Sequence, residues 1–139
     1  MSVLVAGHRQ LDHTADLALE LWADSEVELL EEGARALIGI LTEQARVKAP
    51  SSRVLCLDAL DREDRLIRWL NEVLYLAVSE GFLVLSAEIT LEGTGLSARL
   101  SGEAGAFEKI RCELKSATYH DLLLQESETG WLARVVIDV

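Results

Sequence analysis

The chain of 139 residues is poor in proline, cysteine and basic residues. Its two cysteines, Cys56 and Cys112, have no second cysteine at metal-ligand spacing, which argues against a zinc site and against a disulfide framework. We expect both to be reduced, half-buried strand residues, and reduced cysteines are typical of the cytoplasm. The 13 Lys and Arg residues against 24 Asp and Glu residues give a formal net charge of −11. That charge disfavours direct binding of nucleic acid and favours a basic partner or a hard cation.

The sequence also lacks long apolar runs and the common catalytic motifs. No run approaches the ~20 apolar residues that span a bilayer, and residues 1–10 lack the basic start of a signal peptide, so no membrane association is expected. There is no nucleophile elbow, no H-E-x-x-H pair, no Walker glycine loop and no dinucleotide fingerprint. Half of the residues are hydrophobic, which is enough for the buried core of one soluble domain.

The first half of the chain alternates between strand and helix patterns. Residues 17–23 alternate strictly, which predicts a strand with one buried face. Ser25 and Glu28 form a capping box ahead of apolar residues at helical spacing, which predicts an amphipathic helix. The segment around Pro50, the only proline, is the clearest connector, and a second strand is predicted over 53–59.

A second helix is predicted to begin after Asp61, as its N-cap, and to end at Gly81. Beyond it the helical spacing disappears, and alternating runs are separated by glycines, which is typical of antiparallel strands. The strands predicted in this half cover 82–92, 96–101, 110–125, where a break near Ser116 is left open, and 131–138. The complete order predicts an α+β fold in which two helices pack on an antiparallel sheet.

The order of elements contains a repeated unit. The predicted elements of 53–101 run strand, helix, strand, strand, and those of the flanking parts run in the same order, although the residues themselves show no internal similarity. We therefore expect a single domain, 1–139, in which an inserted module of about 47–102 interrupts an outer module of about 8–46 plus 103–139. An outer module made of both ends must bring the first and last predicted strands into one sheet.

That geometry would bring three carboxylates together. Asp16 directly precedes the first predicted strand, while Asp138 ends the last one and is followed by the terminal carboxylate of Val139. Carboxylates this close repel one another unless a cation or a proton lies between them. Oxygen ligands suit a hard ion such as Ca²⁺ or Mg²⁺ better than zinc. The alternative is that Asp16 caps a turn and Asp138 belongs to a solvated tail.

Two further stretches carry polar groups of interest. Asp12 and His13 lie in the same six-residue stretch as Asp16, LDHTAD over 11–16. For His13 a hydrogen-bonded structural role is more common than a role as a ligand. The stretch KSATYH, which begins at Lys115, reads as a strand whose side chains alternate between two faces, so its members cannot all line one site. Asp12, His13 and Lys115 are therefore supporting candidates only.

Four segments together carry a resemblance to a known family. LDHTADLALELW near the start, LIRWLNEVLYL in the second predicted helix, KSATYH, and VVIDV at the end resemble the archease family, in that order and over nearly the full length. Residues 7–10 depart from the aromatic and acidic lead-in that is common before the first segment. The resemblance implies two strand-helix-strand-strand modules, one inserted in the other. It also implies a protein cofactor of the RtcB-type RNA ligase, which promotes guanylylation of the ligase and its multiple turnover.

The resemblance implies a metal site as well, on Asp16, Asp138 and Val139, with Asp12 and His13 in support. Two functions remain open. The first is an activator of an RNA ligase that holds a divalent cation, Ca²⁺ before Mg²⁺, and has no turnover of its own. The second is a metal-dependent hydrolase that uses Asp12, His13, Asp16 and Asp138, for which a catalytic base beside an open coordination position is required. The sequence leaves open the identity of the ion, the ligase surface contacted, the oligomeric state and the RNA served.

Overall fold

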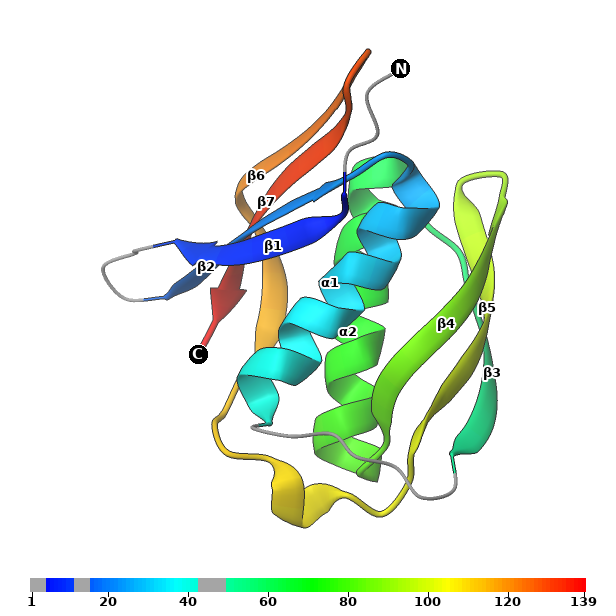
Figure 1. Cartoon of the computed structure of the whole chain (residues 1–139), viewed down its shortest axis with the longest axis vertical. Coiled ribbons are helices and arrows are strands. Elements are labelled where there is room, and N and C mark those ends of the chain that lie inside the picture. Colours follow the sequence, from blue (N-terminus) through cyan, green and yellow to red (C-terminus); the bar gives the residue numbers. More distant parts are fainter. Residues whose placement is uncertain (1–4, 12–15, 43–49) are drawn as a thin grey trace.

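In the computed structural model, which describes residues 5–11, 16–42 and 50–139, two helices lie between two antiparallel sheets (Figure 1). The elements in chain order are β1 (Gly7–Leu11), β2 (Leu17–Ala23), α1 (Glu26–Leu41), β3 (Ser51–Leu57), α2 (Arg62–Glu80), β4 (Leu83–Glu92), β5 (Gly95–Glu103), a 3₁₀ turn (Phe107–Lys109), β6 (Ser116–Ser127) and β7 (Gly130–Asp138). The predicted α+β class is confirmed, and the strands divide into two sheets rather than one.

The two sheets come from different parts of the chain. The four-stranded sheet has the order β1-β2-β7-β6 and is built from both ends, whereas the three-stranded sheet has the order β3-β5-β4 and is built from the middle. The middle part is the predicted strand-helix-strand-strand unit, and it is inserted in an outer unit that has one strand more than predicted, because β1 precedes β2. α1 packs against β4 as well as β2, and α2 packs against β6, so both helices contribute to one shared core. The exact module boundaries, near 46/47 and 102/103, remain a prediction.

The strand pairing that matters most for the candidate site is that of β2 with β7. The two strands are antiparallel, and their register runs from Leu17 opposite Ile137 to Ala23 opposite Trp131. This confirms the prediction that the strand over 17–23 shares a sheet with the last strand. Leu19, Leu21 and the residues opposite them point into the core.

Both helices begin, and α2 ends, where their capping residues predict. The Ser25 hydroxyl accepts a hydrogen bond from the Glu28 N–H at 3.1 Å, which satisfies one free donor at the start of α1. The Asp61 carboxylate does the same for Asp64 at the start of α2, at 2.8 Å. Gly81 ends α2 in the left-handed conformation, with φ of 68°, which a residue without a Cβ adopts at little cost.

Two strand predictions differ from the structure. Nothing in the hydrophobic pattern predicts β1, because His8, Arg9 and Gln10 are consecutive polar residues on an edge strand. The strand predicted over 110–125 begins only at Ser116. The preceding segment follows the end of α1 instead, since the Arg111 N–H donates to the Leu41 carbonyl at 2.7 Å.

The prediction that both cysteines are half-buried strand residues is wrong. Cys56 and Cys112 are both free thiols and both exposed. Cys56 lies on the solvent face of β3, and Cys112 lies in the irregular segment ahead of β6, with its sulfur 3.3 Å from the Ile40 carbonyl. Neither helix that the structure describes combines the length and apolar character needed to cross a bilayer.

α2 fixes the first part of β6. The Asn71 side chain accepts from the Ala117 N–H at 2.7 Å and donates to the Ala117 carbonyl at 3.2 Å, so it pairs with β6 as a neighbouring strand would. The register of β6 against β7 is then interrupted between Thr118 and Leu123, where Asp121 has a positive φ of 51°. Tyr119 lies within this bulge, where it is exposed and reaches α2 with its hydroxyl.

Asp64 is the anchor for this bulge. Its buried carboxylate accepts from the Leu60 N–H at 2.9 Å, from Arg68 at 2.7 Å and from the Tyr119 hydroxyl. The hydrogen bond from Leu60 outweighs the effect of burial and, with Arg68, lowers the pKa of Asp64 below its usual value. The carboxylate therefore joins the start of α2 to the bulge of β6.

Replacing Asp64 by Ala should lower the free energy of unfolding by about 2 kcal/mol, because a buried N–H and a hydroxyl lose their acceptor. Tyr119→Phe removes only one of these bonds and should cost at most about 1 kcal/mol. Urea unfolding followed by circular dichroism measures both values. Equal losses in the two variants would show that Asp64 acts only through Tyr119.

Candidate functional site

The candidate site lies where β2 begins and β7 ends. Leu17 is opposite Ile137, so the same register continued by one residue places Asp16 opposite Asp138. On the other side of β7, Asp138 pairs with Ser116 of β6, and its carbonyl accepts a hydrogen bond from the Lys115 N–H at 2.7 Å. Three chain segments that are far apart in the sequence therefore meet at the end of β7.

Strand alternation places both aspartates on the face of the sheet away from the helices. The neighbours Leu17 and Ile137 point toward the core, so the residues one step further along each strand point the other way. Directly opposite residues in an antiparallel pair have Cα atoms about 4.5–5.5 Å apart. Asp138 is exposed, Asp16 is half-buried and Val139 is 45% exposed, so the carboxylates are accessible from solvent.

The donor set fits a hard cation. Among the described residues, neither Asp16 nor Asp138 forms an ion pair with a basic side chain, so two neighbouring carboxylates are left without a compensating charge. Within 5–11, 16–42 and 50–139, no group of three or more His, Cys, Asp or Glu side chains is arranged to hold a metal. Val139, the third predicted ligand, directly follows Asp138 and is exposed. All three donors are oxygens, as Ca²⁺ and Mg²⁺ prefer.

The structure describes only one of the three supporting candidates, Lys115. Asp12 and His13 lie outside the described residues. Lys115 is exposed and directly precedes β6, and its main chain is tied to Asp138. Lys115 is thus a neighbour of the candidate site, and its supporting role remains a prediction.

Sequence reasoning missed a charged group on the same face of the sheet. Glu20 is only 6% exposed, and its carboxylate is bound by Arg9 of β1 at 2.6 Å and by Arg134 of β7 at 2.9 Å. The hydrogen bond from Arg134 is the largest of the effects that lower the pKa of Glu20, with Arg9 acting in the same direction and burial opposing both. This triad links three adjacent strands.

The triad holds the strands that carry the candidate ligands. Glu20 lies on β2 four residues after Asp16, and Arg134 lies on β7 four residues before Asp138. The signal in the sequence is a glutamate at a strand position among apolar residues, which is costly unless it is paired. Its partners come from two other strands, so they become recognisable only once the register is known.

Glu20→Gln should lower the free energy of unfolding at pH 7 by about 1 kcal/mol, because two exposed guanidinium groups lose their anion. A carboxylate whose pKa is lowered in the folded state stabilises above its unfolded pKa of about 4.3, and that contribution is lost as pH falls. The difference between wild type and Glu20→Gln should therefore shrink below about pH 4. Urea titrations between pH 3 and 7 test this, and a difference that does not change with pH would contradict it.

Comparison with known proteins gives a consistent result. The chain matches the model of the "Archease protein family (MTH1598/TM1083)" over residues 8–139. It is 31% identical to "Protein archease" of Archaeoglobus fulgidus over 135 residues, covering 95% of this chain and 98% of that protein. It is 32% identical to "Protein archease" of Methanosarcina mazei over 139 residues, covering 95% of each.

Solved structures agree on the fold. The solution structure of Methanobacterium thermoautotrophicum protein 1598 superposes with a TM-score of 0.71 at 22% identity, covering 96% of this chain and 99% of that one. The crystal structure of a Thermotoga maritima protein described as an archease and possible chaperone gives 0.64 at 26% identity, covering 94% and 96%. With the family model matched along almost the whole chain and the same fold in both structures, this chain belongs to the archease family.

Proposed function

We propose that this archease is a protein activator of an RtcB-type RNA ligase in the cytoplasm, and that it acts in tRNA splicing or RNA repair. In this role it promotes guanylylation of the ligase and its multiple turnover, and it performs no turnover of its own. Membership of the archease family supports the proposal. The observation that carries it is the meeting of Asp16 and Asp138 at the solvent-exposed end of the β2–β7 pair.

In this proposal Asp16, Asp138 and Val139 hold one divalent cation, Ca²⁺ in preference to Mg²⁺. When bound, the ion supplies a positive charge that offsets the repulsion of the carboxylates and can polarise an oxygen of the ligase or its nucleotide. The chain's own residues fix the position of the site. Lys115 holds the end of β7 through its main-chain N–H, and Glu20 ties β2 to β7 further along the same face.

The net charge supports the choice of partner. With −11 charges, this chain is suited to bind the basic surface of an RNA-binding enzyme without contacting RNA itself. Complementary charge mainly accelerates encounter, and it weakens as salt screens the two surfaces. In this proposal the bound ion is needed for activation of the ligase after docking. The net negative charge sets the rate at which the two proteins associate.

Binding of the ion should stabilise the fold. A cation at about 100 times its dissociation constant adds about 2.7 kcal/mol to the free energy of unfolding, which for a chain of this size raises Tm by about 5–10 °C. Asp16→Asn should abolish the dependence of Tm on Ca²⁺, whereas Asp58→Asn, at an exposed position after β3, should keep it. Differential scanning calorimetry in Ca²⁺ and in chelator measures the shift. A wild-type protein that melts identically in both would rule out the ion site.

Removing the ligands should affect activation more than folding. Adding this protein to its cognate ligase with GTP and a divalent metal should raise the yield of guanylylated ligase and of joined RNA. Asp16→Ala and Asp138→Ala should each lose most of that stimulation while retaining the wild-type circular dichroism spectrum, and Asp58→Ala should retain the stimulation. Single-turnover guanylylation with radiolabelled GTP measures the effect. Equal rates with and without the protein, with a ligase shown to be active, would reject the activator and favour the metal-dependent hydrolase.

A further inference from the structure

A groove lies between α2 and the segment that leads into β6, outside the candidate site. Its helix wall is formed by Leu74, Tyr75 and Val78, and its opposite wall by residues 113–116 (Figure 1). The groove has a volume of about 350 Å³, which is in the range of pockets that enclose a ligand. Leu74 and Leu114 are only 3% and 4% exposed, so they form its apolar floor.

The rim of the groove is apolar and open to solvent. Tyr75 and Val78 are 54% and 44% exposed, whereas the other large apolar side chains of α2 are buried. Residues three apart on a helix are neighbours, so these two side chains form one continuous apolar surface beside the floor. Exposed apolar side chains that gather around a pocket are typical of a site that binds another molecule.

The opposite wall is held in place by the fold itself. The Asn71 side chain binds the backbone of Ala117 through two hydrogen bonds, at 2.7 and 3.2 Å. The Lys115 N–H donates to the Asp138 carbonyl at 2.7 Å, and Ser116 pairs with Asp138. Residues 115 and 116 therefore line the groove and also hold the end of β7, so the groove lies beside the candidate ion site. A preformed surface binds at a lower entropic cost than one that must be ordered.

Charge decides which kind of molecule the groove suits. Glu113 lines the groove, and Glu72 follows the lining residue Asn71 on α2. In the part of the chain that the structure describes, neither carboxylate is ion-paired with a basic side chain, and Lys115 is the only basic residue in the lining. The groove therefore attracts a cationic segment. The same excess of negative charge, −11 over the whole chain, repels a second copy and an RNA backbone.

We propose that this groove binds a segment of the partner ligase in which one apolar side chain is flanked by Lys or Arg residues. The apolar side chain lies on the floor beside Tyr75 and Val78, and a neighbouring basic side chain pairs with Glu113. The proposal rests on the function proposed above, and it adds the surface that the ligase contacts. Binding in the groove holds the ligase segment beside the end of β7, where the proposed ion acts.

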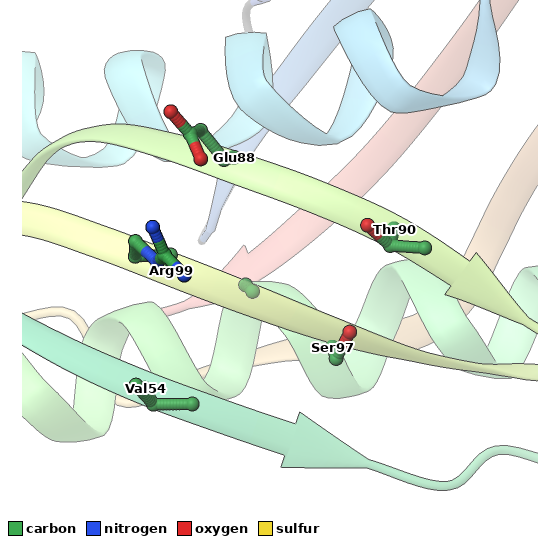
Figure 2. Close-up of a pocket in the computed structure, with 6 residues that line it drawn as sticks. Val54, Glu88, Thr90, Ser97 and Arg99 are labelled. Carbon is green, nitrogen blue, oxygen red and sulfur yellow. The ribbon is translucent and has the colours of Figure 1, made fainter.

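Val78→Asp tests the apolar part of the groove. It should raise the Kd for the ligase about tenfold in isothermal titration calorimetry, because a buried apolar contact is lost. Val54→Asp is the matched control, since Val54 is 79% exposed on the solvent face of the three-stranded sheet (Figure 2), and it should leave the Kd unchanged. At saturating concentration Val78→Asp should still stimulate guanylylation fully. Asp16→Ala should not, because only that variant lacks an ion ligand.

Glu113→Lys tests the charge of the groove. Glu88→Lys changes the net charge by the same amount at an exposed position on β4, so it accounts for the general loss of attraction (Figure 2). Glu113→Lys should raise the Kd several times more than Glu88→Lys does, and high salt should reduce this difference. Glu113 is exposed, so its replacement leaves the core intact and keeps the test valid even if Val78→Asp does not fold.

Three results would overturn the proposal. The first is no binding to a ligase shown to be active. The second is an equal Kd for each variant and its control, with the proteins folded by circular dichroism. The third is a mass that rises above 15.3 kDa with concentration in sedimentation equilibrium and that Val78→Asp keeps at the monomer value, which would assign the groove to a second copy. Binding through the groove without stimulation of guanylylation would instead reject the activator and leave the docking surface in place.

Discussion

The pairing of β2 with β7 is the interaction on which the rest of the structure depends. It joins strands from opposite ends of the chain, and without it the four-stranded sheet would be two separate hairpins, β1–β2 and β6–β7. An isolated hairpin is marginally stable at best in water. The pairing also closes the outer module around the inserted one, so the helices of both modules share one core. The same pairing creates the place where Asp16 meets Asp138.

The carboxylates on one face of this sheet lie in two different electrostatic environments. Glu20 is nearly inaccessible, and its charge is neutralised by Arg9 and Arg134. It therefore links strands and is poorly placed to bind a cation. Asp16 and Asp138 lie four residues away along their strands, where neither pairs with a described basic side chain. Carboxylates at short range repel one another, and a bound cation would remove that repulsion. The difference between a structural carboxylate and a candidate ligand is thus the presence or absence of arginine on the adjacent strand.

Local signals made the helices predictable, and the order of elements made the pairing of β2 with β7 predictable. Ser25, Asp61 and Gly81 cap α1 and α2 through contacts within five residues of the chain, so short-range chemistry is sufficient. The meeting of the two aspartates follows from nested modules, without any knowledge of side-chain contacts. The arginines around Glu20 and the pairing of Asn71 with β6 could not be foreseen, since both depend on register between distant segments. β1 was missed because an edge strand needs no hydrophobic alternation.

β7 contributes to both stability and the candidate site, but through different faces. Val135 and Ile137 are fully buried and hold the sheet against the helices, whereas Arg134 and Asp138 point away from the core. Because successive side chains of a strand point to opposite faces, a substitution at Asp138 leaves the packing of Ile137 in place. Substitutions at Asp138 should therefore leave the packing of the core unchanged. If a variant at Asp138 is folded but no longer activates the ligase, the loss is therefore due to the missing carboxylate and not to unfolding of β7.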